Sequence, residues 1–202
     1  MSYTTLPHGI ACLVLERFRA ILAEHGEERI PTINHRLRFE RLLLLACEAV
    51  NDRCREFHPE WSLRLSGHVM LYQPGAHDPI RPTTLRNALS QNVAEGRMVK
   101  DSLDCPTNYG LTPAGEAAAR ETLEILAETL SCEMVESTID AVLRTWRTTE
   151  PISLLRPIYE QAATVISREG PQATLDVRDA PVRHFVEAYL LRPLPSATLT
   201  PA

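Results

Sequence analysis

The spacing of apolar side chains predicts that most of this chain is helical. Apolar residues recur every three or four positions along residues 9–57, the period of a helix with one buried face. We expect one helix over about 9–25, stopped by Gly26, and a longer one over about 33–57. The positions expected to face the core are Ile10, Leu13, Val14, Phe18, Ile21 and Leu22, then Leu37, Leu44, Leu45, Val50 and either Cys47 or Glu48. Five arginines of the second helix are expected to be exposed: Arg36, Arg38, Arg41, Arg53 and Arg55.

The next segment has a different pattern. Residues 61–71 alternate apolar and polar side chains, which is typical of a strand. This segment is either an extra strand paired with a later hairpin or the helix that supports the element following it. Residues 73–82 then form a long turn rich in Pro and Gly.

Residues 81–119 carry the clearest local signals. Leu85, Ala88, Leu89 and Val93 form the apolar face of a helix, and Gly96 is a typical residue to end it. Residues 97–100 and 109–111 are expected to pair as two short strands around a polar turn. Thr112 followed by Pro113 is a strong signal for the start of a new helix.

That new helix is expected to run to about Arg147, with a break near Ser131 and Cys132. It carries two apolar stripes: Leu123, Leu126, Leu130 and Met134, then Val135, Ile139, Val142, Leu143 and Trp146. Two offset stripes suit either a homodimer through residues 112–147 or a helix whose two stripes both face the core of its own chain. Further helices are expected over 152–167 and 180–191, and residues 194–202 have the composition of a disordered tail.

The segment from Thr83 to Ala119 resembles the winged-helix DNA-binding regulators of the multiple-antibiotic-resistance and PadR-like types, whose wing often ends in a Y-x-L-T-x-x-G pattern. Residues 109–115, YGLTPAG, match that pattern. The resemblance extends at most over about residues 63–147, and the long turn at 73–82 departs from it. It implies a mainly α fold: a winged helix-turn-helix with a two- or three-stranded wing, flanked by N- and C-terminal helices. The expected regions are 1–58 (N-terminal helices), 59–120 (winged helix), 121–193 (C-terminal helices) and 194–202 (tail).

The resemblance also implies where double-stranded DNA would bind. Arg86, Asn87, Ser90 and Gln91 would face the major groove, because such side chains hydrogen-bond to base edges and phosphates. Phosphate contacts are expected from Arg81, Thr83 and Thr84 at the start of the helix. Arg97, Lys100 and Asn108 on the wing would reach the adjacent backbone or the minor groove.

Charge both supports and limits that expectation. The 202 residues carry a net charge of −5, yet residues 81–100 hold four bases and one acid, a net charge of +3. Residues 111–150 hold three bases and eight acids, a net charge of −5. This asymmetry fits a DNA binder that contacts DNA through one face only, with few neutralised phosphates and modest affinity. The acidic balance fits the alternative equally: a winged-helix protein-interaction subunit of a DNA-processing or chromosome-organising complex.

Other chemistry is weakly represented. The chain has no Gly-rich phosphate loop and no hydrolase or zinc-protease motif, so we expect no enzyme activity and no cofactor. Cys47, Cys54 and His58 share a helical spacing and are the best metal candidate, but buried packing explains them more simply. The five scattered cysteines and the absence of a signal peptide or a long apolar run predict a cytoplasmic protein that does not enter a membrane.

Overall fold

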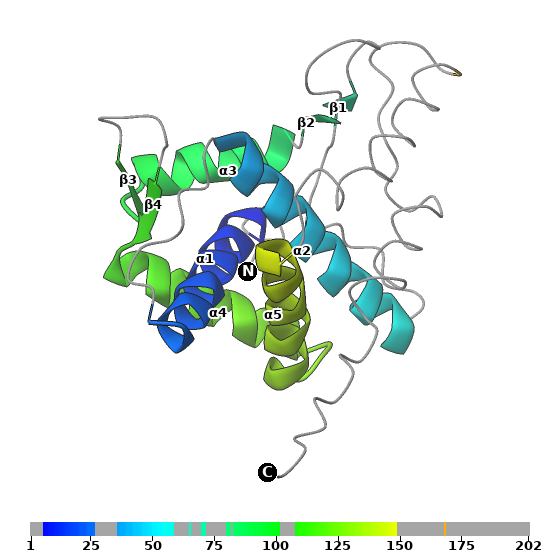
Figure 1. Cartoon of the computed structure of the whole chain (residues 1–202). Coiled ribbons are helices and arrows are strands. Elements are labelled where there is room, and N and C mark those ends of the chain that lie inside the picture. The colour runs from blue at the N-terminus through cyan, green and yellow to red at the C-terminus, as the bar shows by residue number, and fades with distance from the viewer. Residues whose placement is uncertain are drawn as a thin grey trace.

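The computed structural model describes residues 6–26, 36–58, 83–101 and 108–148, together with 65, 70–71, 80–81 and 168. Over these residues the chain is mainly α-helical, as expected, with two short antiparallel strand pairs (Figure 1). The elements are α1 (Leu6–Glu24), α2 (Arg36–Phe57), β1 (Met70–Leu71), β2 (Ile80–Arg81), α3 (Thr83–Ala94), β3 (Met98–Asp101), β4 (Asn108–Leu111), α4 (Pro113–Ala127) and α5 (Cys132–Thr148). The helices expected over 152–167 and 180–191 and the expected tail lie outside the described residues, apart from Arg168.

Helix α1 is the centre of the packing. It contacts α3, α4 and α5 and lies among them in Figure 1. All six apolar residues expected to face the core are buried, and Ala11, Cys12 and Leu15 are buried with them. Because α1 also contacts α2, it packs against four helices and buries more than one face, so its apolar surface is wider than an amphipathic stripe.

Helix α2 begins and ends close to its expected bounds, but the prediction that its arginines are exposed is wrong in part. Every residue from Phe39 to Asn51 is buried, because α2 packs against α5 and also contacts α1 and α3. Arg41, expected on an exposed face, is only 2% exposed. Arg53 and Arg55 are half-buried and form ion pairs with Glu56 and Asp52 one turn away. The side chains of Arg36 and Arg38 lie outside the described residues.

The last two residues of the alternating segment 61–71, Met70 and Leu71, form strand β1. Met70 pairs with Arg81 and Leu71 with Ile80 in an antiparallel register. This pair is separate from the β3–β4 hairpin, so the alternative in which the segment pairs with that hairpin does not hold for Met70 and Leu71. Before Met70, only Leu65 is described, and it is buried in the core.

The expected long helix after Thr112 is two helices, α4 and α5, separated near the predicted break. The second apolar stripe, on α5, is buried throughout, and in the first stripe Leu126 and Leu130 are buried while Leu123 and Met134 are partly buried. Both stripes thus belong to the chain's own hydrophobic core. Packing within the chain therefore explains the pattern that suggested a homodimer through 112–147.

One hydrophobic cluster joins helices α1 to α5 and both strands of the hairpin. Phe39 of α2 and Tyr109 of β4 are in ring contact within it, with centroids 5.4 Å apart. No helix among the described residues has the length and apolar character needed to cross a membrane.

Candidate nucleic-acid interface

Helix α3 has one buried face and one exposed face. Leu85, Ala88 and Leu89 are buried, as predicted, and the helix packs against α1. Asn87, Ser90 and Gln91 are exposed and form a polar stripe along the opposite face, which Ala94 extends. The structure therefore brings together three of the four residues expected to face a major groove.

A buried asparagine on the inner face of α3 fixes the helix to the N-terminus of α1. Asn92 is fully buried, and its Nδ2 donates a hydrogen bond to the backbone carbonyl of His8 over 2.9 Å. Sequence reasoning missed this residue. Its position one turn after Ala88, on the apolar face, was the available signal, because a polar side chain on such a face needs a buried partner.

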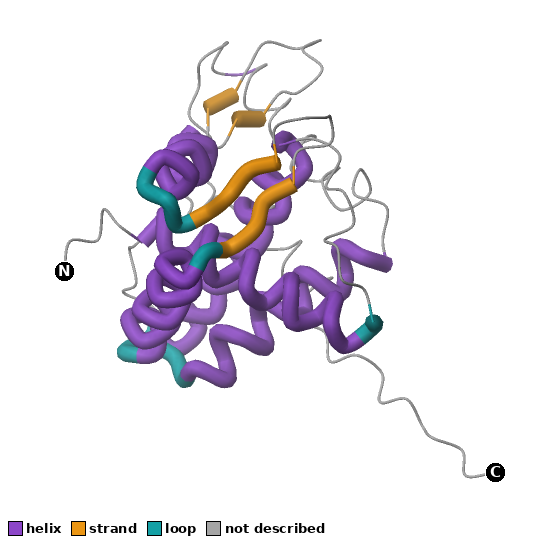
Figure 2. Tube along the Cα trace, turned by 90° about the vertical axis from the view of Figure 1, so that its left-hand side faces the viewer, coloured by secondary structure: helices purple, strands orange, loops and turns teal. Residues whose placement is uncertain are grey.

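The β3–β4 hairpin follows α3 directly (Figure 2, the longer pair of orange strands). Gly96 has a φ of +71° and turns the chain from the helix into β3, as predicted. The strands pair from Met98 with Leu111 to Asp101 with Asn108. Of the turn between them, residues 102–107 lie outside the described residues.

The residues that match the Y-x-L-T-x-x-G pattern join the base of the hairpin to α4. The Thr112 hydroxyl donates toward the carbonyl oxygens of Gly96 (2.7 Å) and Arg97 (3.0 Å), and it accepts a hydrogen bond from the N–H of Gly115. A Cβ on Gly115 would lie 2.1 Å from the carbonyl oxygen of Arg97. Thr112 and Gly115 of this pattern therefore hold the start of α4 close to the end of α3.

Two expected DNA-binding arginines have acidic partners within the chain. Nε of Arg86 lies 3.9 Å from Oε1 of Glu40, whose side chain is 1% exposed, so Arg86 lies at the α2 edge of the exposed face. Arg97 forms an ion pair with Glu95 and donates a hydrogen bond from its guanidinium to Oδ1 of Asn92 (3.2 Å). Arg86 therefore contributes less net charge to this surface than the sequence suggests, because Glu40 lies outside residues 81–100. The acidic partner of Arg97, Glu95, is already included in the net charge of +3 for that segment.

Glu95 also orients Gln91. The Gln91 side-chain amide donates a hydrogen bond to Oε1 of Glu95 over 2.7 Å. That hydrogen bond, with the charges of Arg97 and His8, lowers the pKa of the Glu95 carboxyl below its usual value. The carboxyl is therefore ionised at neutral pH, and its bond to Gln91 is charge-assisted.

The other residues expected to contact DNA lie on the hairpin and at the start of α3. Lys100 is exposed on β3 beside Val99, which is 56% exposed. Thr83 and Thr84 are half-buried in the first turn of α3. For Arg81 and Asn108 only the backbone is described. Lys100 is thus the candidate cation on the hairpin that is best placed to meet a partner.

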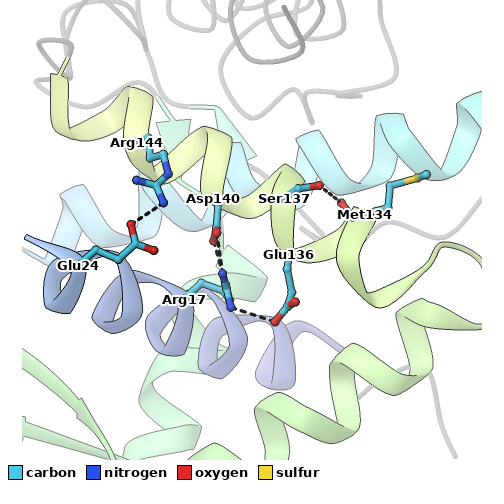
Figure 3. A network of polar contacts seen from close by, with 7 residues as sticks. All are labelled: Arg17, Glu24, Met134, Glu136, Ser137, Asp140 and Arg144. Carbon is cyan, nitrogen blue, oxygen red and sulfur yellow. Dashed lines mark hydrogen bonds and ion pairs between the residues drawn. The ribbon is translucent and has the colours of Figure 1, made fainter. Parts of the chain in front are cut away.

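A second polar network joins α1 to α5 (Figure 3). Arg17 donates to both carboxylate oxygens of Asp140, at 2.9 and 2.6 Å, and to Glu136 at 3.0 Å. Arg144 pairs with Glu24 at 2.6 Å. Part of the negative charge of the C-terminal helices is therefore used to hold α5 against α1.

Three of the four cysteines in the described part of the chain are buried. Cys12, Cys47 and Cys54 lie in the core, whereas Cys132 is exposed. Burial raises the pKa of Cys12 and of Cys54 to about 11, and it raises that of Cys47 as well. Among the residues that the structure describes, no three His, Cys, Asp or Glu side chains are grouped so that they could hold a metal ion.

No model of a known protein family, no curated protein and no solved structure matches this chain.

Proposed function

We propose that this protein is a winged-helix protein that binds double-stranded DNA, either as a regulator or as the DNA-engaging component of a larger system. Helix α3 would lie in the major groove, and the β3–β4 hairpin would act as the wing. The observation that carries the proposal is the polar stripe of Asn87, Ser90 and Gln91 on a helix whose C-terminal end leads directly into a hairpin bearing Lys100. A helix with such a face fits the width of the major groove and can reach base edges.

Hydrogen bonds that hold α3 and the base of the hairpin in place support the proposal. Asn92 fixes α3 to α1, and Thr112 joins the end of α3 to the start of α4. A helix and hairpin held in this way keep a constant spacing, so both could contact one duplex without a rearrangement. Preorganisation of this kind lowers the entropic cost of binding.

The test is fluorescence anisotropy of a labelled random-sequence duplex at several salt concentrations. Binding should weaken as salt rises, with the shallow slope expected when few phosphates are neutralised. Lys100→Ala should lower the affinity and reduce the slope of log K against log salt by about one. Arg120→Ala is the matched control, because Arg120 is an exposed arginine on α4 outside the proposed interface. It should leave the slope unchanged.

A double variant tests the major-groove face. Arg86→Ala combined with Gln91→Ala should weaken DNA binding without unfolding the protein. Unchanged affinity in this folded variant would contradict the assignment of the α3 face to DNA.

A specific observation favours a second candidate function, a protein-interaction subunit of a DNA-processing complex. Arg86 and Arg97 both have acidic partners within the chain, and the hairpin exposes the apolar side chain of Val99. This function predicts no binding of free duplex even at low salt. That result, with a partner recovered by the wild type and lost with Val99→Asp, would replace the DNA-binding proposal.

A further inference from the structure

On the exposed face of α3, the side chain of Gln91 is oriented by a hydrogen bond. Gln91 donates one amide hydrogen to Oε1 of Glu95, and Glu95 is held in turn by its ion pair with Arg97. Arg97 donates to Asn92, which is buried and bonded to the backbone of α1. A continuous series of polar contacts thus runs from the exposed amide of Gln91 to the core.

This series leaves a definite set of hydrogen-bonding groups on Gln91. A glutamine amide has two N–H donors and one carbonyl acceptor, and Glu95 uses one of the donors. One N–H and the carbonyl oxygen remain, which is the donor–acceptor pair that matches N7 and N6 of adenine in the major groove. Both carboxylate oxygens of Glu95 already have partners, Gln91 on one and Arg97 on the other.

Two neighbouring side chains, Ser90 and Arg86, are less suited than Gln91 to reading a base. The Ser90 hydroxyl donates to the backbone carbonyl of Arg86, so its hydrogen is already used. Arg86, the type of residue that would select guanine, lies toward Glu40 at the edge of the face. Asn87 is exposed on the same stripe as Gln91, one turn earlier along the helix.

We infer that Gln91 reads an adenine in the major groove, and that Glu95 and Arg97 are positioning residues that orient its amide. This inference rests on the proposed DNA-binding function. It assigns to Arg97 a role different from a backbone contact: Arg97 neutralises and holds the carboxylate that would otherwise repel the DNA. Discrimination should therefore depend on residues that do not touch a base.

The experiment begins with wild-type protein and a pool of synthetic duplexes with a randomised central segment. The selected duplexes should share an A·T pair at one position, and replacing its adenine by guanine should weaken binding about tenfold. Gln91→Ala should bring the ratio of the two affinities close to one. Circular-dichroism melting checks that each variant remains folded.

Variants of the positioning residues Glu95 and Arg97 should change the ratio of the two affinities in ways that a structural or phosphate-binding role would not. Glu95→Ala should lower the adenine-to-guanine ratio while the affinity for non-selected duplex is kept or raised, because an acid near the phosphates has been removed. Arg97→Ala should lower the same ratio with an unchanged salt slope. Lys100→Ala is the control and should weaken both duplexes equally with a smaller slope.

Each contrary result has a distinct meaning. If Gln91→Ala leaves the adenine preference intact, Gln91 does not read that base and the inference is wrong, although the DNA-binding function stands. If Arg97→Ala weakens both duplexes equally and reduces the salt slope by about one, Arg97 contacts a phosphate and its positioning role is wrong. If the wild type binds no duplex, the proposed function fails and the inference fails with it.

Discussion

Gly9 of α1 lies directly against Thr122 of α4. A Cβ atom on Gly9 would be 1.8 Å from Oγ1 of Thr122 and 3.0 Å from its Cβ. Thr122 is 4% exposed, and its hydroxyl donates to the backbone carbonyl of Ala118 over 2.8 Å. The absence of a side chain at position 9 therefore allows α1 and α4 to approach closely beneath α3 and the hairpin.

Gly9→Ala should destabilise the protein by about 1–3 kcal/mol, because the added methyl group overlaps a buried side chain. Helix propensity alone predicts the opposite, a gain of about 0.5–1 kcal/mol. Urea denaturation distinguishes the two. Combining Gly9→Ala with Thr122→Ala should recover part of the loss, since the nearest atom is removed. An increase in stability for Gly9→Ala would contradict the close approach.

The ion pair between Arg17 and Asp140 should contribute measurably to stability. Both side chains are largely buried, at 22% and 16% exposed, and the two hydrogen bonds are parallel. A double-mutant cycle with Arg17→Ala and Asp140→Ala should give a coupling free energy of about 1 kcal/mol. The more exposed Arg144–Glu24 pair is the control, with an expected coupling of at most about 0.5 kcal/mol. Equal couplings would show that burial of the first pair adds nothing.

Glu16 should make the protein less stable as it ionises. Burial, and then the charge of Glu116, raises the pKa of Glu16 above its usual value. Its stabilising contribution is thus complete below the unfolded-state pKa of about 4 and lost as the pH rises through the folded pKa. Glu16→Gln should therefore raise the stability at pH 7, by less than about 1 kcal/mol because the group is partly exposed.

The comparison with pH 3 is the control for Glu16. The wild type and Glu16→Gln should unfold at nearly the same urea concentration there, because the carboxyl is then protonated in both states of the wild type. Glu24 and Glu95 have lowered pKa values and act with the opposite sign, but they are common to both proteins. A gain that persists at pH 3 would point to a cause other than ionisation.

The cysteines should differ sharply in reactivity. In the folded protein at pH 8, iodoacetamide should modify Cys132, which is exposed, while Cys12, Cys47 and Cys54 are protected. Their burial hinders access, and a pKa of about 11 for Cys12 and Cys54 leaves almost no thiolate. Peptide mapping before and after unfolding measures the extent to which each cysteine has been modified. Rapid modification of Cys54 in the folded state would contradict the buried environment of α2.

The sequence alone predicted the elements around the candidate interface closely. The end of α3 at Gly96, the pairing of the two strands and the start of α4 at Thr112 all depend on residues a few positions apart. A left-handed glycine, a hydroxyl that caps the next turn and a proline at the first helical position act through local sterics and hydrogen bonds. Their effects are therefore visible in the order of residues.

Tertiary structure decided which partners the charged side chains have and which faces of the central helices are buried. Arg86 lies toward Glu40, Arg17 pairs with Asp140, and Asn92 bonds to the backbone of His8, each across a long separation in sequence. The burial of Arg41 likewise follows from packing of α2 against several helices at once. The sequence gives the number of charged residues but not which residue each of them contacts. Only the three-dimensional packing of distant segments fixes that partner, and with it the charge left for a ligand.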